Sequence, residues 1–238
     1  MRTVAAVFRR ELSSYFDSPL AYIVIPAFLI LVGAFSLYFQ DLFGSGVVSM
    51  RGVFFWCAVW FLLLIPAVTM RSFAEERRSG SLELLATMPL SEAQIVLGKY
   101  LASVMVMSVA LLLTLTYPIT LAFLGSLDPG PVVGGYIGLL LLGMSFCAIG
   151  TAVSAFTSNQ IVAFLVALVI CTLPFASGFA LSQVPPSILP LVQYISFETH
   201  FNNLARGVID SRNIVYYGTV TAVFLHLAVF GLERRRLS

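Results

Sequence analysis

The sequence has 238 residues, of which 59% are hydrophobic and only 10% are charged, with a formal net charge of +2. Soluble domains carry about 25% charged residues, and a chain of this length could not hide so much apolar surface from water. The composition excludes an ordinary soluble domain and predicts a membrane protein.

The sequence lacks the motifs of several enzyme and redox classes. Cys57, Cys147 and Cys171 all lie in apolar runs without redox or metal-ligand spacing, so we interpret them as small buried hydrophobes. The motifs GxxxxGK[ST], GxSxG and HExxH do not occur. We therefore expect no P-loop, no catalytic, cofactor or metal site, and no nucleic-acid partner.

Residues 1–17 have apolar side chains at helical spacing, among them Val4, Phe8 and Leu12, with charged residues on the other side. This pattern predicts an amphipathic helix in the membrane interface, although a simple charged lead-in is the alternative. Pro19 disfavours helix at Ser18 and should end the segment.

Six apolar runs are long enough to cross a bilayer as helices. They cover about 20–39, 53–70, 100–124, 132–155, 161–181 and 214–231, and as drawn they contain no Asp, Glu, Lys or Arg. The predicted fold is an all-α polytopic membrane protein with six transmembrane helices in one domain, residues 1–238. Gly134 and Gly138 in the fourth run form a GxxxG pair, typical of close helix packing but also frequent in membrane helices generally.

The polar stretch 71–99 separates the second run from the third. Its helical pattern should continue from the second run to Arg78, with Arg71 and Glu75 at i,i+4 spacing and Gly80 in a left-handed cap. Ser91 and Gln94 have the spacing of a capping box for the next helix. The charges Glu75, Glu76, Arg77 and Arg78 either tie the stretch to the N-terminal helix or a partner, or belong to a solvated helix extension.

Between Gly80 and Pro89 lies a segment too short to be a stable helix alone, so it needs a partner surface. Its apolar side chains fall on two sides, so a helix here could touch both the membrane subunit and a soluble partner, with Glu83 fixing register. The residues expected to contact a partner are Ser81, Leu82, Glu83, Leu84, Leu85, Thr87, Met88 and Pro89.

The connection 182–213 contains Pro185, Pro186 and Pro190 and is too interrupted to span a membrane. We expect one or two half-inserted or surface helices there. Glu198 and His200 could in principle bind a metal, but one His and one carboxylate make a weak site, and hydrogen-bonded loop residues are the alternative.

Orientation follows from the distribution of Lys and Arg. With six spans, both termini and the stretch 71–99 share one side. That side collects Arg2, Arg9, Arg10, Arg71, Arg77, Arg78, Lys99, Arg234, Arg235 and Arg236, whereas the other collects Arg51, Arg206 and Arg212. The excess predicts cytoplasmic termini and an extracytoplasmic 182–213 connection.

Ion-coupled carriers need ionisable groups or broken helices at mid-membrane depth, and the six runs contain no such charges. A transporter built this way should take its energy from a separate ATPase that presses on the stretch 71–99. Hydroxyls such as Thr114 and Thr120 should mostly bond to their own helix. Two other readings stay open: a subunit of the same fold that transmits force without transport, and a passive channel or membrane enzyme.

Three segments resemble type-2 ABC transporter permeases, most closely the gliding-motility permease GldF and its relatives in non-gliding bacteria. They are FRRELSSYFDSPLAYI from Phe8, RSFAEERRSGSLELLATMPLSEAQIVLGKYLA from Arg71, and HFNNLARGVIDSRNIVYY from His200. The matching positions of the third are His200, Phe201, Arg206, Gly207, Val208, Ile209, Asp210 and Arg212, with Asn213 where an acidic residue is expected.

This resemblance implies a multi-pass subunit of the bacterial inner membrane. It implies an N-terminal connecting helix, a coupling helix between spans 2 and 3, and re-entrant helices between spans 5 and 6. Two permeases would pair, as a homodimer or heterodimer, and dock on two copies of a GldA-like ATPase, which binds ATP and Mg²⁺. A GldG-like membrane protein with an extracytoplasmic domain would accompany them. The expected function is export of an unidentified substrate, with no enzyme activity in this chain.

Overall fold

The computed structural model describes residues 2–40, 49–80 and 91–236, and every regular element in them is helical. Six helical segments are long and apolar enough to cross a membrane, as predicted: Pro19–Phe39, Arg51–Arg78, Glu92–Leu124, Pro129–Phe156, Gln160–Gln183 and Ser211–Arg234. The prediction of an all-α polytopic membrane protein is confirmed.

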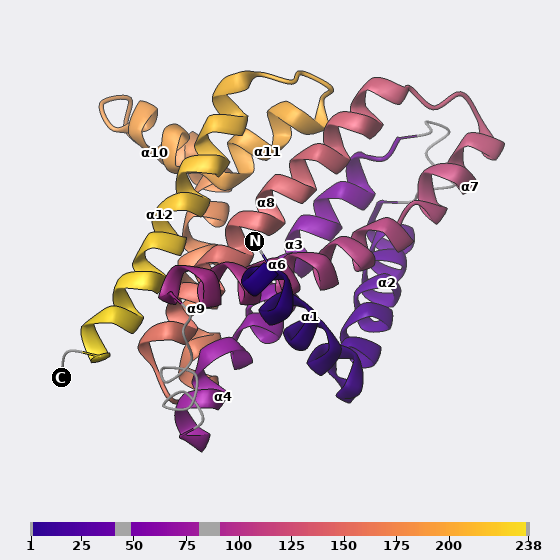
Figure 1. Cartoon of the computed structure of the whole chain (residues 1–238). Coiled ribbons are helices and arrows are strands. Elements are labelled where there is room, and N and C mark those ends of the chain that lie inside the picture. The colour runs from indigo at the N-terminus through magenta and orange to yellow at the C-terminus, as the bar shows by residue number, and fades with distance from the viewer. Residues whose placement is uncertain (1, 41–48, 81–90, 237–238) are drawn as a thin grey trace.

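Helix α8 (Pro129–Phe156) lies at the centre of the bundle (Figure 1). It packs against α3 (Arg51–Thr69), α4 (Arg71–Ser79), α6 (Glu92–Leu113), α9 (Gln160–Ser177), α11 (Phe197–Ala205) and α12 (Ser211–Arg236). Glycines permit these close approaches. A Cβ on Gly134 would lie 2.2 Å from the Leu204 carbonyl oxygen, and one on Gly138 would lie 3.1 Å from the Phe201 ring. The GxxxG pair is therefore a packing face against α11.

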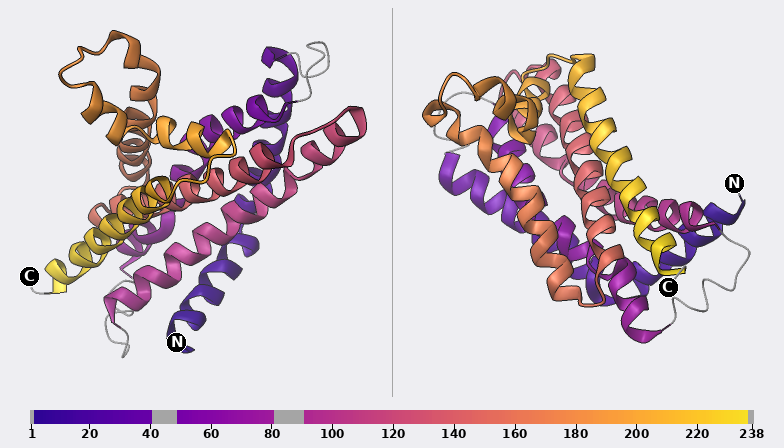
Figure 2. Two further views of the ribbon diagram at one scale, coloured as in Figure 1. Left: turned by 90° about the horizontal axis from the view of Figure 1, so that it is seen from above. Right: turned by 90° about the vertical axis from the view of Figure 1, so that its left-hand side faces the viewer.

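The two ends of the bundle carry different elements (Figures 1 and 2). At one end lie α4 and the C-terminal end of α12. At the other lie α10 (Leu189–Ile195) and α11, preceded by the 3₁₀ turn η1 (Gly178–Gln183). The expected one or two short helices between the fifth and sixth spans are thus present, and the fifth span ends in a 3₁₀ turn.

The N-terminal segment forms α1 (Arg2–Asp17), followed by α2 (Pro19–Gln40), with the break at Ser18 as predicted. Helix α1 packs mainly against α6. The contact is close, because a Cβ on Gly98 would lie 2.6 Å from Cγ1 of Val7. The apolar side of α1 is therefore partly buried against the rest of the protein.

The apolar run 100–124 had suggested one uninterrupted helix for the third span, but the structure shows two helices there. Helix α6 ends at Leu113 and α7 (Thr116–Leu124) follows. At the break the Thr114 hydroxyl donates to the Leu111 carbonyl at 2.6 Å and lies 3.1 Å from the Tyr136 hydroxyl. Pro118, which lacks an N–H, adds to the interruption. Thr116 and Thr120 also bond to carbonyls of their own segment, as expected.

Candidate functional site

The two helix caps that the sequence predicted within the stretch 71–99 are present in the structure. Gly80 caps α4 with φ +72°, a left-handed conformation that favours glycine. Ser91 caps α6, and its side chain and that of Gln94 form both bonds of the capping box. The proposed partner-contact residues Ser81–Pro89 lie outside the described residues, so their helix and contacts stay a prediction.

A buried lysine joins the helices that flank this stretch. The Lys99 ammonium on α6 donates to Glu11 Oε1 on α1 at 2.8 Å and to Glu76 Oε1 on α4 at 2.9 Å. It also lies 5.2 Å from the centre of the Phe73 ring. The Lys99 side chain is 2% exposed, whereas its two carboxylate partners are 17% and 14% exposed. We call Glu11, Glu76 and Lys99 the charge triad.

Because the charge triad is largely buried, its two carboxylates depend on Lys99 for the compensation of their charge. A buried ion is expensive unless it is paired and hydrogen-bonded, so loss of Lys99 would leave two partly buried carboxylates without their cation. A compact ammonium with three donors can serve two carboxylates at once, which suits lysine at this position. The triad joins α1, α4 and α6, and the last two are the helices on either side of residues 81–90.

The remaining charges of α4 have different surroundings. Glu75 makes the predicted i,i+4 pair with Arg71 at 2.8 Å, on a partly exposed surface where such pairs contribute little. Arg78 is exposed, and Arg77 is partly buried. Glu76 ties the stretch to the N-terminal helix, because it shares Lys99 with Glu11. The sequence could not distinguish Glu76 from its charged neighbours.

Helix α4 is also attached to the central helix. The second span does continue to α4, but with a break at Met70, where the Ser154 hydroxyl of α8 enters the helix. Its oxygen accepts from the Phe73 and Ala74 N–H groups at 3.0 and 3.1 Å, and its hydrogen is donated to the Met70 carbonyl at 3.0 Å. A side chain inserted in the backbone ladder is a known cause of helix kinks. A displacement of α4 would therefore act directly on α8 through the Ser154 hydrogen bonds.

A polar pocket of about 270 Å³ lies beside the charge triad, lined by Arg10, Glu11, Ser14, Tyr15, Ser18, Arg71, Ser72, Glu75, Glu76 and Lys99. Its arginines and lysine are matched by as many glutamates. The lining is therefore formally neutral, and its Lys99, Arg71 and three glutamates form ion pairs with one another. Burial raises the pKa of Tyr15 at its wall, and the Tyr15 hydroxyl donates to the Val68 carbonyl at 3.3 Å. The Tyr15 hydrogen bond attaches α1 to the end of α3.

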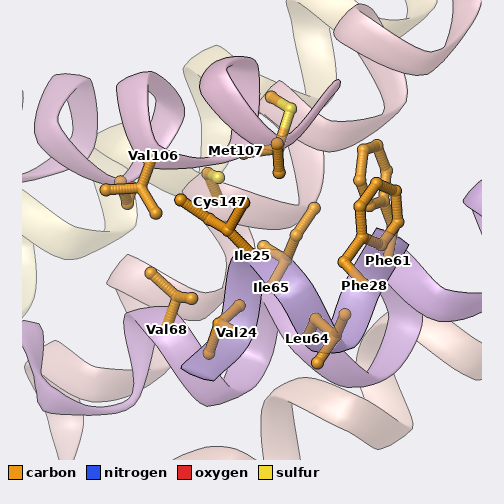
Figure 3. A pocket seen from close by; sticks show the side chains of 12 residues that line it. Val24, Ile25, Phe28, Phe61, Leu64, Ile65, Val68, Val106, Met107 and Cys147 are labelled. Atoms are coloured by element: carbon orange, nitrogen blue, oxygen red, sulfur yellow. The ribbon is translucent and has the colours of Figure 1, made fainter. Parts of the chain in front are cut away.

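A second pocket lies between the span helices α2, α3, α6 and α8, and it is much smaller than the polar pocket. Figure 3 shows the apolar side chains that line this pocket, among them Met107 and the stacked rings of Phe28 and Phe61. The pocket measures about 20 Å³, room for little more than one water molecule. A substrate could not pass through it, so any transport path would have to lie elsewhere, for example between two chains.

The third sequence motif lies at the opposite end of the bundle. His200 Nδ1 is 2.7 Å from Asn213 Oδ1, its Nε2 is 3.0 Å from the Tyr194 carbonyl oxygen, and its ring stacks on Tyr216 at 4.0 Å. Asn213 thus serves as a hydrogen-bond partner where an acidic residue was expected. Phe201 is buried, and Gly207 has φ +85°. Asp210 accepts from the Arg212 N–H at the start of α12.

Glu198 and His200 do not form a pair with each other, since Glu198 accepts from the Asn202 amide. Among the described residues no group of three or more His, Cys, Asp or Glu side chains could hold a metal ion. His200 and Glu198 therefore act in this structure as separately hydrogen-bonded residues.

Comparison with known families agrees with this architecture. The profile of the family described as "ABC-2 family transporter protein" matches residues 40–232. The chain belongs to this family. It is accordingly a membrane permease subunit of an ABC transporter, a class that works with an ABC ATPase and is generally not catalytic itself. No curated protein matches the sequence. Helix α1, which supplies Glu11 to the charge triad, lies before the matched region.

Proposed function

We propose that this chain is a GldF-like permease in a bacterial inner membrane, with both termini and the stretch 71–99 in the cytoplasm. It would convert ATP hydrolysis by a separate ATPase into export of a substrate. The proposal includes a single permease domain over residues 1–238 and a coupling helix at Ser81–Pro89. The partners are two copies of a GldA-like ATPase, which bind ATP and Mg²⁺, a second permease chain, and a GldG-like protein.

The charge triad is the observation that carries this proposal. A loop that only links two spans does not need to be fixed on both sides to a third helix. Here Lys99 and Glu76 stand at the two ends of the loop, and both are joined to α1 through one buried ammonium. This arrangement suits a rigid support through which a force on the loop reaches α3 and α6.

The test is co-purification of the permease with an ATPase encoded beside it, using wild type and a variant with charge reversal at Glu83 or proline at Leu84. The variants should lose ATPase binding and stimulation of ATP hydrolysis. Wild-type levels of both in the variants would refute the coupling-helix assignment. A proline at Gly46, in the loop on the other side, serves as the matched control.

A force-transmitting subunit without transport is the alternative that the packed interior supports. The pocket of about 20 Å³ leaves no route within the four helices around it. Structures of the paired complex in two nucleotide states decide between the two. A path that opens between the chains in one state favours export, and an interface that is sealed in both favours force transmission.

A further inference from the structure

A third pocket, of about 170 Å³, lies at the end of the bundle opposite α4. Arg51, Phe55, Phe201, Asn202, Ala205 and Arg206 line it. Arg51 begins α3, and Arg206 follows the last residue of α11, so two distant parts of the sequence bring a guanidinium to the same pocket. Phe201 and Ala205 are buried and form an apolar base.

The two guanidiniums are available for a ligand. Both arginines are exposed, and neither forms an ion pair with a described residue. The nearest acidic neighbour with an evident influence is Glu198, whose pKa is raised by its burial and lowered to a lesser extent by the Asn202 hydrogen bond and by Arg206. The pocket therefore carries an excess of positive charge.

The backbone holds these arginines in place. The Arg206 N–H donates to the Asn202 carbonyl at 3.1 Å, and the next residue, Gly207, has φ +85°. A Cβ on Gly207 would lie 3.0 Å from the backbone of Gly130, so α8 fixes this turn. At the other wall the Arg51 N–H donates to Ser49 Oγ at 3.3 Å, next to the buried Met50.

We propose that this pocket binds the phosphate group of an anionic membrane lipid. Guanidinium groups recognise phosphate through paired, charge-assisted hydrogen bonds, and two of them converge here. Arg51, which lines the pocket, is the first residue of a helix long and apolar enough to cross a membrane, and the ends of such helices are where lipid headgroups are met. Phe55 on its wall packs edge-on against Phe179 at 6.0 Å, and Phe179 is 53% exposed. This apolar flank offers a surface to acyl chains, which free phosphate does not have.

The site does not depend on transport or on an ATPase, so the purified permease in a neutral detergent is sufficient for the test. Phosphatidylglycerol, phosphatidylcholine and inorganic phosphate are titrated separately, and the unfolding temperature is followed. Phosphatidylglycerol should raise this temperature more than phosphatidylcholine does. The double variant Arg51→Gln with Arg206→Gln should weaken the apparent affinity for it about tenfold or more.

Arg212→Gln is the matched control, because Arg212 is also exposed and at the same end of the bundle but does not line the pocket. It should bind as wild type does. Glu198→Gln removes the neighbouring negative charge and should bind more tightly. An equal response to phosphatidylglycerol in all variants, or no response in wild type, overturns the site. A full response to inorganic phosphate overturns its assignment to a lipid.

Discussion

Lys99 is the only lysine of the sequence, and it pairs with two carboxylates from two helices that precede it in the chain, α1 and α4. Periodicity could predict that this residue lies just before a span, but not that it is 2% exposed. Its partner Glu11 is 88 residues away, and a single sequence contains no signal that pairs such positions. The charge triad is therefore visible only in the structure.

Replacing Lys99 with Met should destabilise the protein by about 3 kcal/mol, because two partly buried carboxylates lose their cation. The measurement is thermal or denaturant unfolding in detergent. Adding Glu11→Gln and Glu76→Gln to this variant should recover most of the loss, since no charge then remains buried. Equal stability of the single and triple variants would contradict the role given to the triad.

Glu198 should make stability depend on pH. Its folded-state pKa is raised by burial, so the protonated carboxyl is favoured in the native protein. This contribution is complete below the unfolded pKa of about 4.3 and is lost as the pH rises through the folded pKa. Glu198→Gln should therefore have a higher unfolding temperature than wild type at pH 7 and a similar one near pH 4. A constant difference across this range would argue against the pKa shift.

The sequence predicted the elements better than their interruptions. The capping roles of Gly80, Ser91 and Gln94 are confirmed. They could be predicted because each cap involves residues only a few positions apart in the sequence. The break at Met70 depends on Ser154, which is 84 residues away and lies within an apolar run. Local patterns could not show that a hydroxyl from another helix enters the backbone ladder of α3 and α4.

Ser154→Ala should leave the Phe73 and Ala74 N–H groups without the hydroxyl that accepts from them, at a cost of about 1–3 kcal/mol. Hydrogen exchange at these two amides should accelerate more than exchange in α6. Ser158→Ala is the control, because Ser158 is exposed in the turn after α8. Unchanged exchange at Phe73 and Ala74 would show that α4 is held by other contacts.

Gly134→Ala tests the packing of α8 on α11. The added Cβ would lie 2.2 Å from the Leu204 carbonyl oxygen, so the two helices would have to separate. A lower unfolding temperature is expected. Gly218→Ala on α12 meets nothing within 4 Å and should be neutral or stabilising, since Ala favours helix over Gly. A neutral Gly134→Ala would mean that α11 can move away from α8 without loss.

At the scale of the molecule, the two helices that flank residues 81–90 in the chain, α4 and α6, are both attached to other helices of the bundle. Helix α4 is fixed to α8 by Ser154 and to α6 by the charge triad, and α6 is fixed to α1. Membership of the ABC-2 family implies that an ABC ATPase works with this chain. A force applied at residues 81–90 would reach the span helices through the Ser154 hydrogen bonds and the charge triad.

Glu11→Gln separates attachment from docking. Glu11 lies on α1, away from the loop residues proposed to bind the ATPase, and its loss leaves the Lys99–Glu76 pair in place. ATPase binding in a co-purified complex should therefore be retained, while stimulation of ATP hydrolysis by the permease should fall, because α1 loses its ion pair to α6. Asp17→Asn is the matched control, since Asp17 is an exposed acid on the same helix. If Glu11→Gln and Asp17→Asn stimulate hydrolysis equally well, the charge triad stabilises the fold but does not transmit force.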